Sequence, residues 1–125
     1  MVDLTAIILT KNEGDNIEDC LKSIQYFAKR IVLVDSGSTD NTISIAKKYK
    51  VDIYSHKFEN YARQFNWAID NTNITSKWTL RLDADERLTP KLCKELELLI
   101  NQHDNDEVTG ITIEAYFYFL GKCIK

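Results

Sequence analysis

The fold is decided by the apolar stretch LTAIILT at residues 4–10. A near-continuous aliphatic run lacks the alternation of a strand with one solvated face, so it predicts a parallel strand covered on both faces. A second run of this kind, IVLVDS, follows at residues 31–36. Shorter strand patterns lie at residues 51–55 and 78–83.

Helical periodicity fills the intervals between these strands. Apolar residues spaced as on one helix face predict helices over residues 16–27, 39–49, 60–70 and 90–101. We expect Ser38 or Thr39 to cap the second helix, and Pro90 to occupy the first turn of the fourth. Strands that alternate with helices predict a doubly wound, mostly parallel α/β sheet with right-handed crossovers. A last alternating strand is predicted over residues 108–119.

The third helix is expected to have two distinct faces. Ala62, Phe65 and Ile69 share an apolar face, whereas Arg63, Asn66 and Asp70 share a polar one. The polar face either turns toward a ligand or is a solvated surface.

Composition indicates one soluble globular domain, residues 1–125, with net charge −3 and 28% charged residues. The charge balance gives no footprint for nucleic acid. The N-terminal stretch reads as neither a signal peptide nor a membrane span. Three widely spaced cysteines, at 20, 93 and 123, have no metal-ligand pattern and predict reduced thiols in a cytoplasmic protein.

Polar side chains follow three of the predicted strands at the point where each strand ends. They are Thr10, Asn12 and Glu13 after the first strand, Asp35 after the second, and the segment Asp83-Ala84-Asp85-Glu86 after the fourth. Each group alone is typical of a turn or a helix cap. Because ligands of open α/β sheets bind beyond the carboxyl ends of the strands, the three groups together predict a binding site.

The acids of residues 83–86 repel one another and favour a cation. With only oxygen ligands nearby, the expected ion is Mg²⁺ or Mn²⁺, which usually borrows further ligands from substrate phosphates. The implied ligand is a metal–diphosphate, with a nucleoside across the ends of the first two strands. There Asp35 would accept a base N–H, Thr10 and Asn12 would shape the cleft, and Arg63 or Asn66 would meet the nucleotide.

Three motifs in this order resemble the family-2 glycosyltransferases. They are AIILTKNEGDNIEDCLKSI (6–24), IVLVDSGSTDNT (31–42) and WTLRLDADE (78–86). The resemblance implies a Rossmann-like GT-A fold, with the family's nucleotide-binding aspartate at Asp35. It also places the family's DxD motif at Asp83-Ala84-Asp85, with Asp83 near the ribose and a metal-bound water, and Asp85 as a direct metal ligand.

The same resemblance implies an inverting hexosyltransferase. It would move sugar from a nucleotide-diphosphate donor, with UDP expected, to a glycan or lipid-linked acceptor, as in bacterial lipopolysaccharide or lipooligosaccharide core assembly. Such an acceptor would place the enzyme at the cytoplasmic face of the inner membrane.

This sequence departs from the family pattern in two ways. Phe65 precedes Asn66 where the family often has a basic residue. The family's general base lies in a later, acceptor-binding half, so we expect it beyond Lys125 and interpret the chain as the donor-binding portion of a longer enzyme. The alternative is a non-catalytic nucleotide-binding or interaction module of the same fold. A Rossmann dehydrogenase is disfavoured because TKNEGDN, at residues 10–16, lacks G-x-G-x-x-G.

Overall fold

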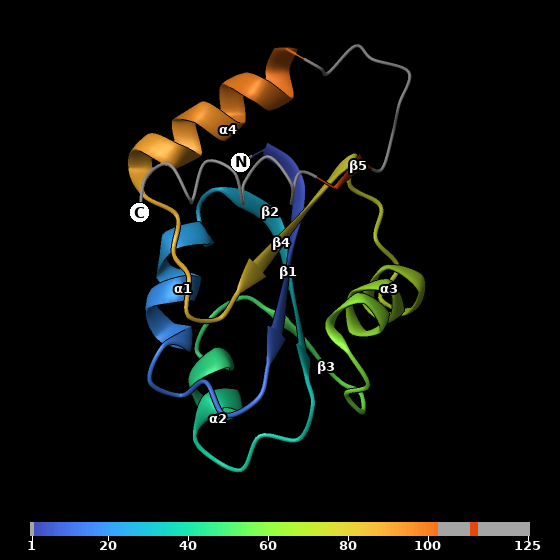
Figure 1. The fold of residues 1–125 in the computed structure, drawn as a ribbon. Coiled ribbons are helices and arrows are strands. Elements are labelled where there is room, and N and C mark those ends of the chain that lie inside the picture. Colours follow the sequence, from blue (N-terminus) through green and yellow to red (C-terminus); the bar gives the residue numbers. More distant parts are fainter. Residues whose placement is uncertain (1, 103–110, 113–125) are drawn as a thin grey trace.

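The computed structural model describes residues 2–102 and 111–112, which alternate strands with helices (Figure 1). The strands are β1 Val2–Thr10, β2 Ala28–Asp35, β3 Asp52–Ser55, β4 Trp78–Asp83 and β5 Ile111–Thr112. The helices are α1 Ile17–Ile24, α2 Thr42–Ala46, α3 Tyr61–Asn71 and α4 Pro90–Gln102. The predicted α/β class is therefore confirmed, and Pro90 opens α4 as expected.

The strands form one sheet in the order β3-β2-β1-β4-β5, and every neighbouring pair is parallel. The chain moves from β1 outward to β2 and β3, then returns to β4 on the other side of β1. This reversal is the switch point of the topology, where parallel α/β sheets open a crevice at their carboxyl ends. The register sets Thr10 opposite Asp35, and Leu9 opposite Asp83, so three strand ends meet there.

Both faces of the sheet are covered, as the apolar runs predicted. On one face, Leu4, Ala6 and Ile8 of β1 pack into a core that includes buried residues of α1 and α4. On the other, Ile7 joins Val32 and Val34 of β2 against α3. Figure 1 shows α3 on the opposite side of the sheet from α1 and α2. The side chains of successive β1 residues thus point alternately into two separate cores.

Three predicted details of the helices were wrong. Asn41, and not Ser38 or Thr39, precedes the first residue of α2, and this helix ends at Ala46 rather than near residue 49. Ser38 and Thr39 instead make contacts with Asp35 and Asn12, described below, so the chain there is a loop. In α3, the buried residues are Gln64, Phe65 and Ala68, whereas Ala62 and Ile69 are exposed.

The strand predicted over residues 108–119 is described only at residues 111–112, where β5 pairs with β4; the rest lies outside the described residues. Cys20 and Cys93 are free thiols, as expected, and Cys123 lies beyond the described part. Among helices of the described residues, none has the length and apolarity needed to cross a bilayer.

Candidate functional site

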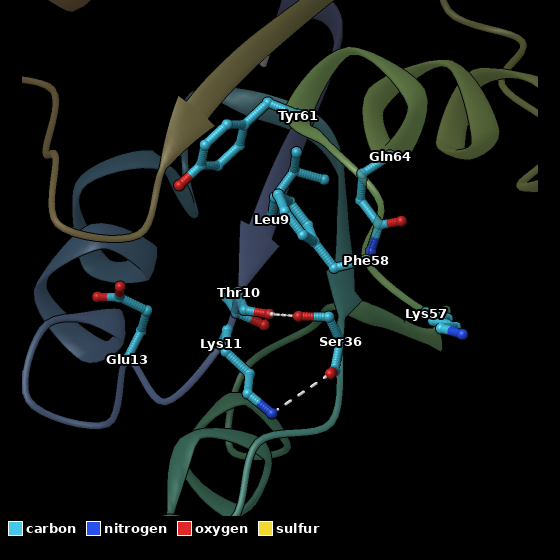
Figure 2. Close-up of a pocket in the computed structure, with 9 residues that line it drawn as sticks. All are labelled: Leu9, Thr10, Lys11, Glu13, Ser36, Lys57, Phe58, Tyr61 and Gln64. Carbon is cyan, nitrogen blue, oxygen red and sulfur yellow. Dashed lines mark hydrogen bonds between the residues drawn. The ribbon is translucent and has the colours of Figure 1, made fainter.

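A cavity of about 480 Å³ opens at the carboxyl ends of β1 and β2 (Figure 2). Its lining combines the end of β1 and the loop after it, the residue after β2, the segment leading into α3, and the first residues of α3 itself. The lining residues are Leu9, Thr10, Lys11, Glu13, Ser36, Lys57, Phe58, Tyr61 and Gln64. The volume falls within the range of small-molecule sites, about 300–1,000 Å³.

The β1–α1 and β2–α2 loops are joined by hydrogen bonds that Asn12 organises. Asn12 takes a left-handed backbone conformation, φ 55°, which asparagine tolerates better than most residues. Its side-chain oxygen accepts the amide N–H groups of Thr39 at 2.7 Å and Asp40 at 3.3 Å. The backbone N–H of Asn12 donates to the Ser38 hydroxyl oxygen at 2.7 Å. Asn12 therefore shapes the loops under the cavity rather than lining it.

Further bonds extend this junction on both sides of Asn12. Lys11 Nζ donates to the Gly37 carbonyl at 2.7 Å, and the Gly14 amide donates to Asp40 Oδ2 at 2.9 Å. A Cβ on Gly14 would lie 2.0 Å from the Asn41 side-chain oxygen, so the close approach of the loops uses a glycine. Asp40 accepts several hydrogen bonds, of which the one from the Thr42 hydroxyl has the largest effect. Together they outweigh desolvation and lower the pKa of Asp40.

Asp35 is the most enclosed carboxylate of the site, with 4% of its surface exposed. One oxygen, Oδ1, accepts the hydroxyls of Thr10 (2.7 Å) and Ser38, and the other accepts the amides of Gly37 (3.0 Å) and Ser38 (2.8 Å). Burial alone would raise the pKa of Asp35, but these hydrogen bonds outweigh it and lower the pKa below the ordinary value.

The four donors occupy the acceptor sites that two carboxylate oxygens offer. A base N–H would therefore reach Asp35 only if one internal donor moved aside. The contact between Asp35 and a nucleobase stays a prediction, and the structure gives the same residue a second role in holding the loop after β2.

The acids that follow β4 lie on a tight turn. The Glu86 amide donates to the Asp83 carbonyl at 2.9 Å, and Glu86 Oε1 accepts the Asp83 amide at 3.0 Å. Ala84 is buried, whereas Asp83 and Asp85 are exposed. Glu86 thus closes the turn, and the two aspartates remain accessible to a ligand.

Negative charge accumulates beside this turn. The Cys20 thiol lies beneath it, with Sγ 3.7 Å from the Asp83 carbonyl oxygen. Burial raises the pKa of Cys20 to about 12, and the charges of Glu86, Asp85, Asp83 and Glu13 add to the effect. Glu13, from the loop after β1, and the acids at the end of β4 therefore all lie close enough to Cys20 to raise its pKa.

Asp83 and Asp85 fit a hard divalent cation by the chemistry of their donors, since both offer carboxylate oxygens. Within residues 2–102, no three His, Cys, Asp or Glu side chains form a group that could hold a metal ion. Mg²⁺ characteristically binds through one or two carboxylates plus substrate phosphates, so this pair suits an ion delivered with a diphosphate.

Helix α3 presents different residues to the cavity from those the sequence suggested. Tyr61 and Gln64 line the cavity. Arg63 and Asn66 share a face with Asp70, as predicted, but they line a second depression of about 290 Å³. Arg63 also forms an ion pair with Glu59 at 2.6 Å. Contacts of Arg63 and Asn66 with a nucleotide stay predictions, and Phe65 is buried against the sheet.

The sequence did not reveal the pair of hydrogen bonds between Gln64 and His56. Gln64 is 2% exposed, its Nε2 donates to the His56 carbonyl at 3.1 Å, and its Oε1 accepts from His56 Nδ1 at 2.8 Å. The His56 ring also stacks on Trp67, with ring centroids 4.2 Å apart. No periodicity signals a buried glutamine. The lining by Phe58 and Tyr61 was also missed, although aromatic residues just before and at the start of a helix are a signal that the sequence does contain.

Comparison with known proteins places this geometry in a family. Residues 5–120 match the family described as glycosyl transferase family 2. The lipopolysaccharide core biosynthesis glycosyltransferase LpsC of Rhizobium meliloti is 31% identical over 123 residues, covering 94% of this chain and 44% of LpsC. An uncharacterized glycosyltransferase of Rickettsia bellii is 32% identical over 111 residues, covering 89% of this chain and 37% of the relative.

Solved structures share the fold. S. aureus TarS 1-349 superposes with a TM-score of 0.63 at 23% identity, covering 83% of this chain and 33% of TarS. Glucosyl-3-phosphoglycerate synthase from Mycobacterium tuberculosis, in complex with Mn²⁺, UDP and glucosyl-3-phosphoglycerate, gives 0.60 at 16% identity, covering 86% of this chain and 40% of the synthase. The chain spans 39% and 41% of the length of two Rickettsia relatives. It belongs to glycosyl transferase family 2.

Proposed function

We propose that this chain binds a nucleotide-diphosphate sugar, with UDP as the nucleotide, together with Mg²⁺ or Mn²⁺. The observation that carries the proposal is that Asp83, on the exposed turn that also bears Asp85, is opposite Leu9 in the sheet register, and Leu9 lines the cavity at the switch point. The nucleoside occupies the cavity over the ends of β1 and β2, and the diphosphate reaches the turn after β4.

Each end of the site supports this orientation. Thr10 and Glu13 line the cavity, where polar groups suit the nucleoside. Asp85 is the direct metal ligand and Asp83 lies between metal and ribose, while buried Ala84 keeps the two acids on one exposed turn. The synthase structure that holds Mn²⁺ and UDP shares the fold with this chain, which supports the same pair of ligands here.

In the whole enzyme, the proposed reaction is a single displacement that inverts the anomeric carbon. The bound metal would neutralise charge on the leaving nucleoside diphosphate, which is worth several kcal/mol. A general base would take the acceptor's proton and add roughly 10²- to 10⁴-fold in rate. Similarity to LpsC, named for lipopolysaccharide core biosynthesis, supports a glycan or lipid-linked acceptor at the cytoplasmic face of the membrane.

Calorimetric titration of the chain with UDP, with and without Mn²⁺, tests donor binding. We expect binding that depends on Mn²⁺ and that Asp85→Ala weakens at least about tenfold, since one of few protein ligands is lost. Glu97→Ala, which removes an exposed acid from α4, is the matched control and should bind as the parent chain does. UDP binding that ignores both Mn²⁺ and Asp85→Ala would refute the proposal.

A second experiment separates the enzyme from a non-catalytic module of the same fold. A chain that continues to the natural end of the protein is incubated with UDP-sugars and Mn²⁺, and released UDP is measured. Hydrolysis or transfer supports the glycosyltransferase. Donor binding without either reaction supports the module.

A further inference from the structure

Two aromatic side chains border the cavity while keeping much of their surface exposed. Phe58 is 42% exposed and Tyr61 is 58% exposed, although both are large and mostly apolar. Their rings meet edge to face, with centroids 5.2 Å apart and planes at 76°. The Arg81 guanidinium carbon lies 5.4 Å from the centroid of the Tyr61 ring. Edge-to-face and cation–π contacts of this kind orient the rings before any ligand arrives.

The cavity therefore has two chemically different sides. Phe58, Tyr61 and Leu9 form one side, which we call the aromatic wall (Figure 2). Thr10, Lys11 and Ser36 lie below it in this view and offer hydroxyl, ammonium and backbone groups. A flat ring with an apolar face and polar edges satisfies both sides at once, since its face covers the wall and its edge meets the polar groups.

The wall also lies at a defined place relative to the acids. Leu9 is opposite Asp83 in the sheet register, and Arg81 precedes Asp83 by two residues on the same strand. The wall thus begins next to the proposed diphosphate and extends toward the end of β2. In a nucleotide sugar, the base and the sugar lie at opposite ends of the diphosphate, so a nucleoside over β1 and β2 brings its base, and not its sugar, to the wall.

We propose that Phe58 and Tyr61 are binding residues that stack against the nucleobase of the donor. This inference rests on the proposed function and adds the side chains that hold the base. Because every base has a π-face, the wall supplies affinity for nucleotides in general, and the polar groups below it select among bases.

The test compares ligands with and without a base. UDP and methyl diphosphate, which has no base, are each titrated into the chain with Mn²⁺. We expect Phe58→Ala and Tyr61→Ala each to weaken UDP binding about tenfold, in line with base–aromatic stacking, and to leave methyl diphosphate binding unchanged. Phe58→Trp, which keeps a stacking surface, should retain the affinity for UDP.

Matched controls separate stacking from loss of structure. Tyr26→Ala removes an aromatic ring that is 81% exposed and does not line the cavity, so it should not change UDP binding. Tyr61→Leu keeps an apolar side chain without a π-face and should weaken UDP as Tyr61→Ala does. Circular dichroism and thermal melting of each variant confirm that it folds.

Three results would overturn the inference. One is that Phe58→Ala and Tyr61→Ala leave UDP binding unaffected while Asp85→Ala weakens it. That result would support the proposed function and refute the role of the aromatic wall in binding the base. Another is weakening confined to UDP-sugars, with UDP itself unaffected, which assigns the wall to the sugar. The third is failure of the parent chain to bind any nucleotide, which removes the proposed function and the inference together.

Discussion

Two replacements of Asp35, by alanine and by asparagine, should show how much its negative charge and how much its hydrogen-bond acceptors contribute to stability. Asp35→Ala leaves the amides of Gly37 and Ser38, which now donate at 3.0 and 2.8 Å, without an acceptor. An unsatisfied buried donor costs about 1–3 kcal/mol, and these two donors, which are only partly buried, should lie in the lower part of that range. The hydroxyls of Thr10 and Ser38 can rotate toward other acceptors. We therefore expect Asp35→Ala to lower the free energy of unfolding by about 2–4 kcal/mol.

Asp35→Asn should cost much less because an amide fits the same set of partners. Its carbonyl oxygen, placed at Oδ2, still accepts both backbone amides, and its NH₂ group, placed at Oδ1, donates to the hydroxyl oxygens of Thr10 and Ser38. What is lost is the charge, since a hydrogen bond to a charged group contributes roughly 1 kcal/mol more than a neutral one. The expected loss is about 1–2 kcal/mol at neutral pH.

The unfolding free energies of the parent chain and of Asp35→Asn should become more similar at acidic pH. Because folding lowers the pKa of Asp35, its ionised form stabilises the fold fully above the ordinary value of 3.8, and this contribution is lost as pH falls below 3.8 toward the lower folded pKa. The difference in unfolding free energy between parent and Asp35→Asn should therefore shrink on acidification.

Urea denaturation followed by circular dichroism, at pH 7 and at pH 3, measures these differences. Asp70→Asn, on the exposed face of α3, is the control for removing one charge. The reasoning is refuted if Asp35→Asn destabilises as much as Asp35→Ala, or if its deficit is the same at both pH values.

Three further changes test the rest of the structure by thermal and urea denaturation. Asn12→Gly keeps the left-handed backbone but loses the acceptor for the Thr39 and Asp40 amides, and should cost about 1–2 kcal/mol; Asn73→Gly, at φ 54°, is the control and should cost less. Leu80→Ala opens a cavity in the core and should cost about 2–5 kcal/mol, whereas Leu98→Ala, 63% exposed, should change little. Gly37→Ala forces a side chain into φ +97° and should cost about 1–2 kcal/mol; an unchanged melting temperature would contradict the assigned backbone.

The sheet could be predicted from sequence because its central strands are apolar on both faces. Ile7 and Ile8 point to opposite cores, and only a strand covered on both sides needs such a pair. The start of β2 was less readable, since Ala28-Lys29-Arg30 extends the strand beyond its apolar part through backbone pairing with β1. Pairing of that kind depends on the neighbouring strand and leaves no local signal.

The location of the candidate site could be predicted from the sequence, whereas the residues that line its cavity were harder to predict. Asp35, Asp83 and Asp85 follow strand ends, and parallel pairing brings such ends together whatever the loops do. Which residues face the cavity depends on the rotation of α3, and burial of Gln64 fixed a rotation that apolar spacing did not reveal. That rotation brings Tyr61 to the cavity and carries Arg63 to the second depression.

The two ends of the site differ in how they are prepared for a ligand. Under the cavity, side chains and amides from the two loops are bonded to each other, so the nucleoside would meet a surface that is already ordered. At the turn after β4, Glu86 fixes the backbone of Asp83 and leaves the exposed aspartates beside a concentration of negative charge. Like charges at close range are unfavourable without a cation, so metal and diphosphate would stabilise this end by arriving together. The proposed site therefore predicts that Mn²⁺ alone binds weakly, that UDP alone binds weakly, and that each increases the affinity of the other by the same factor, which titration in both orders can measure.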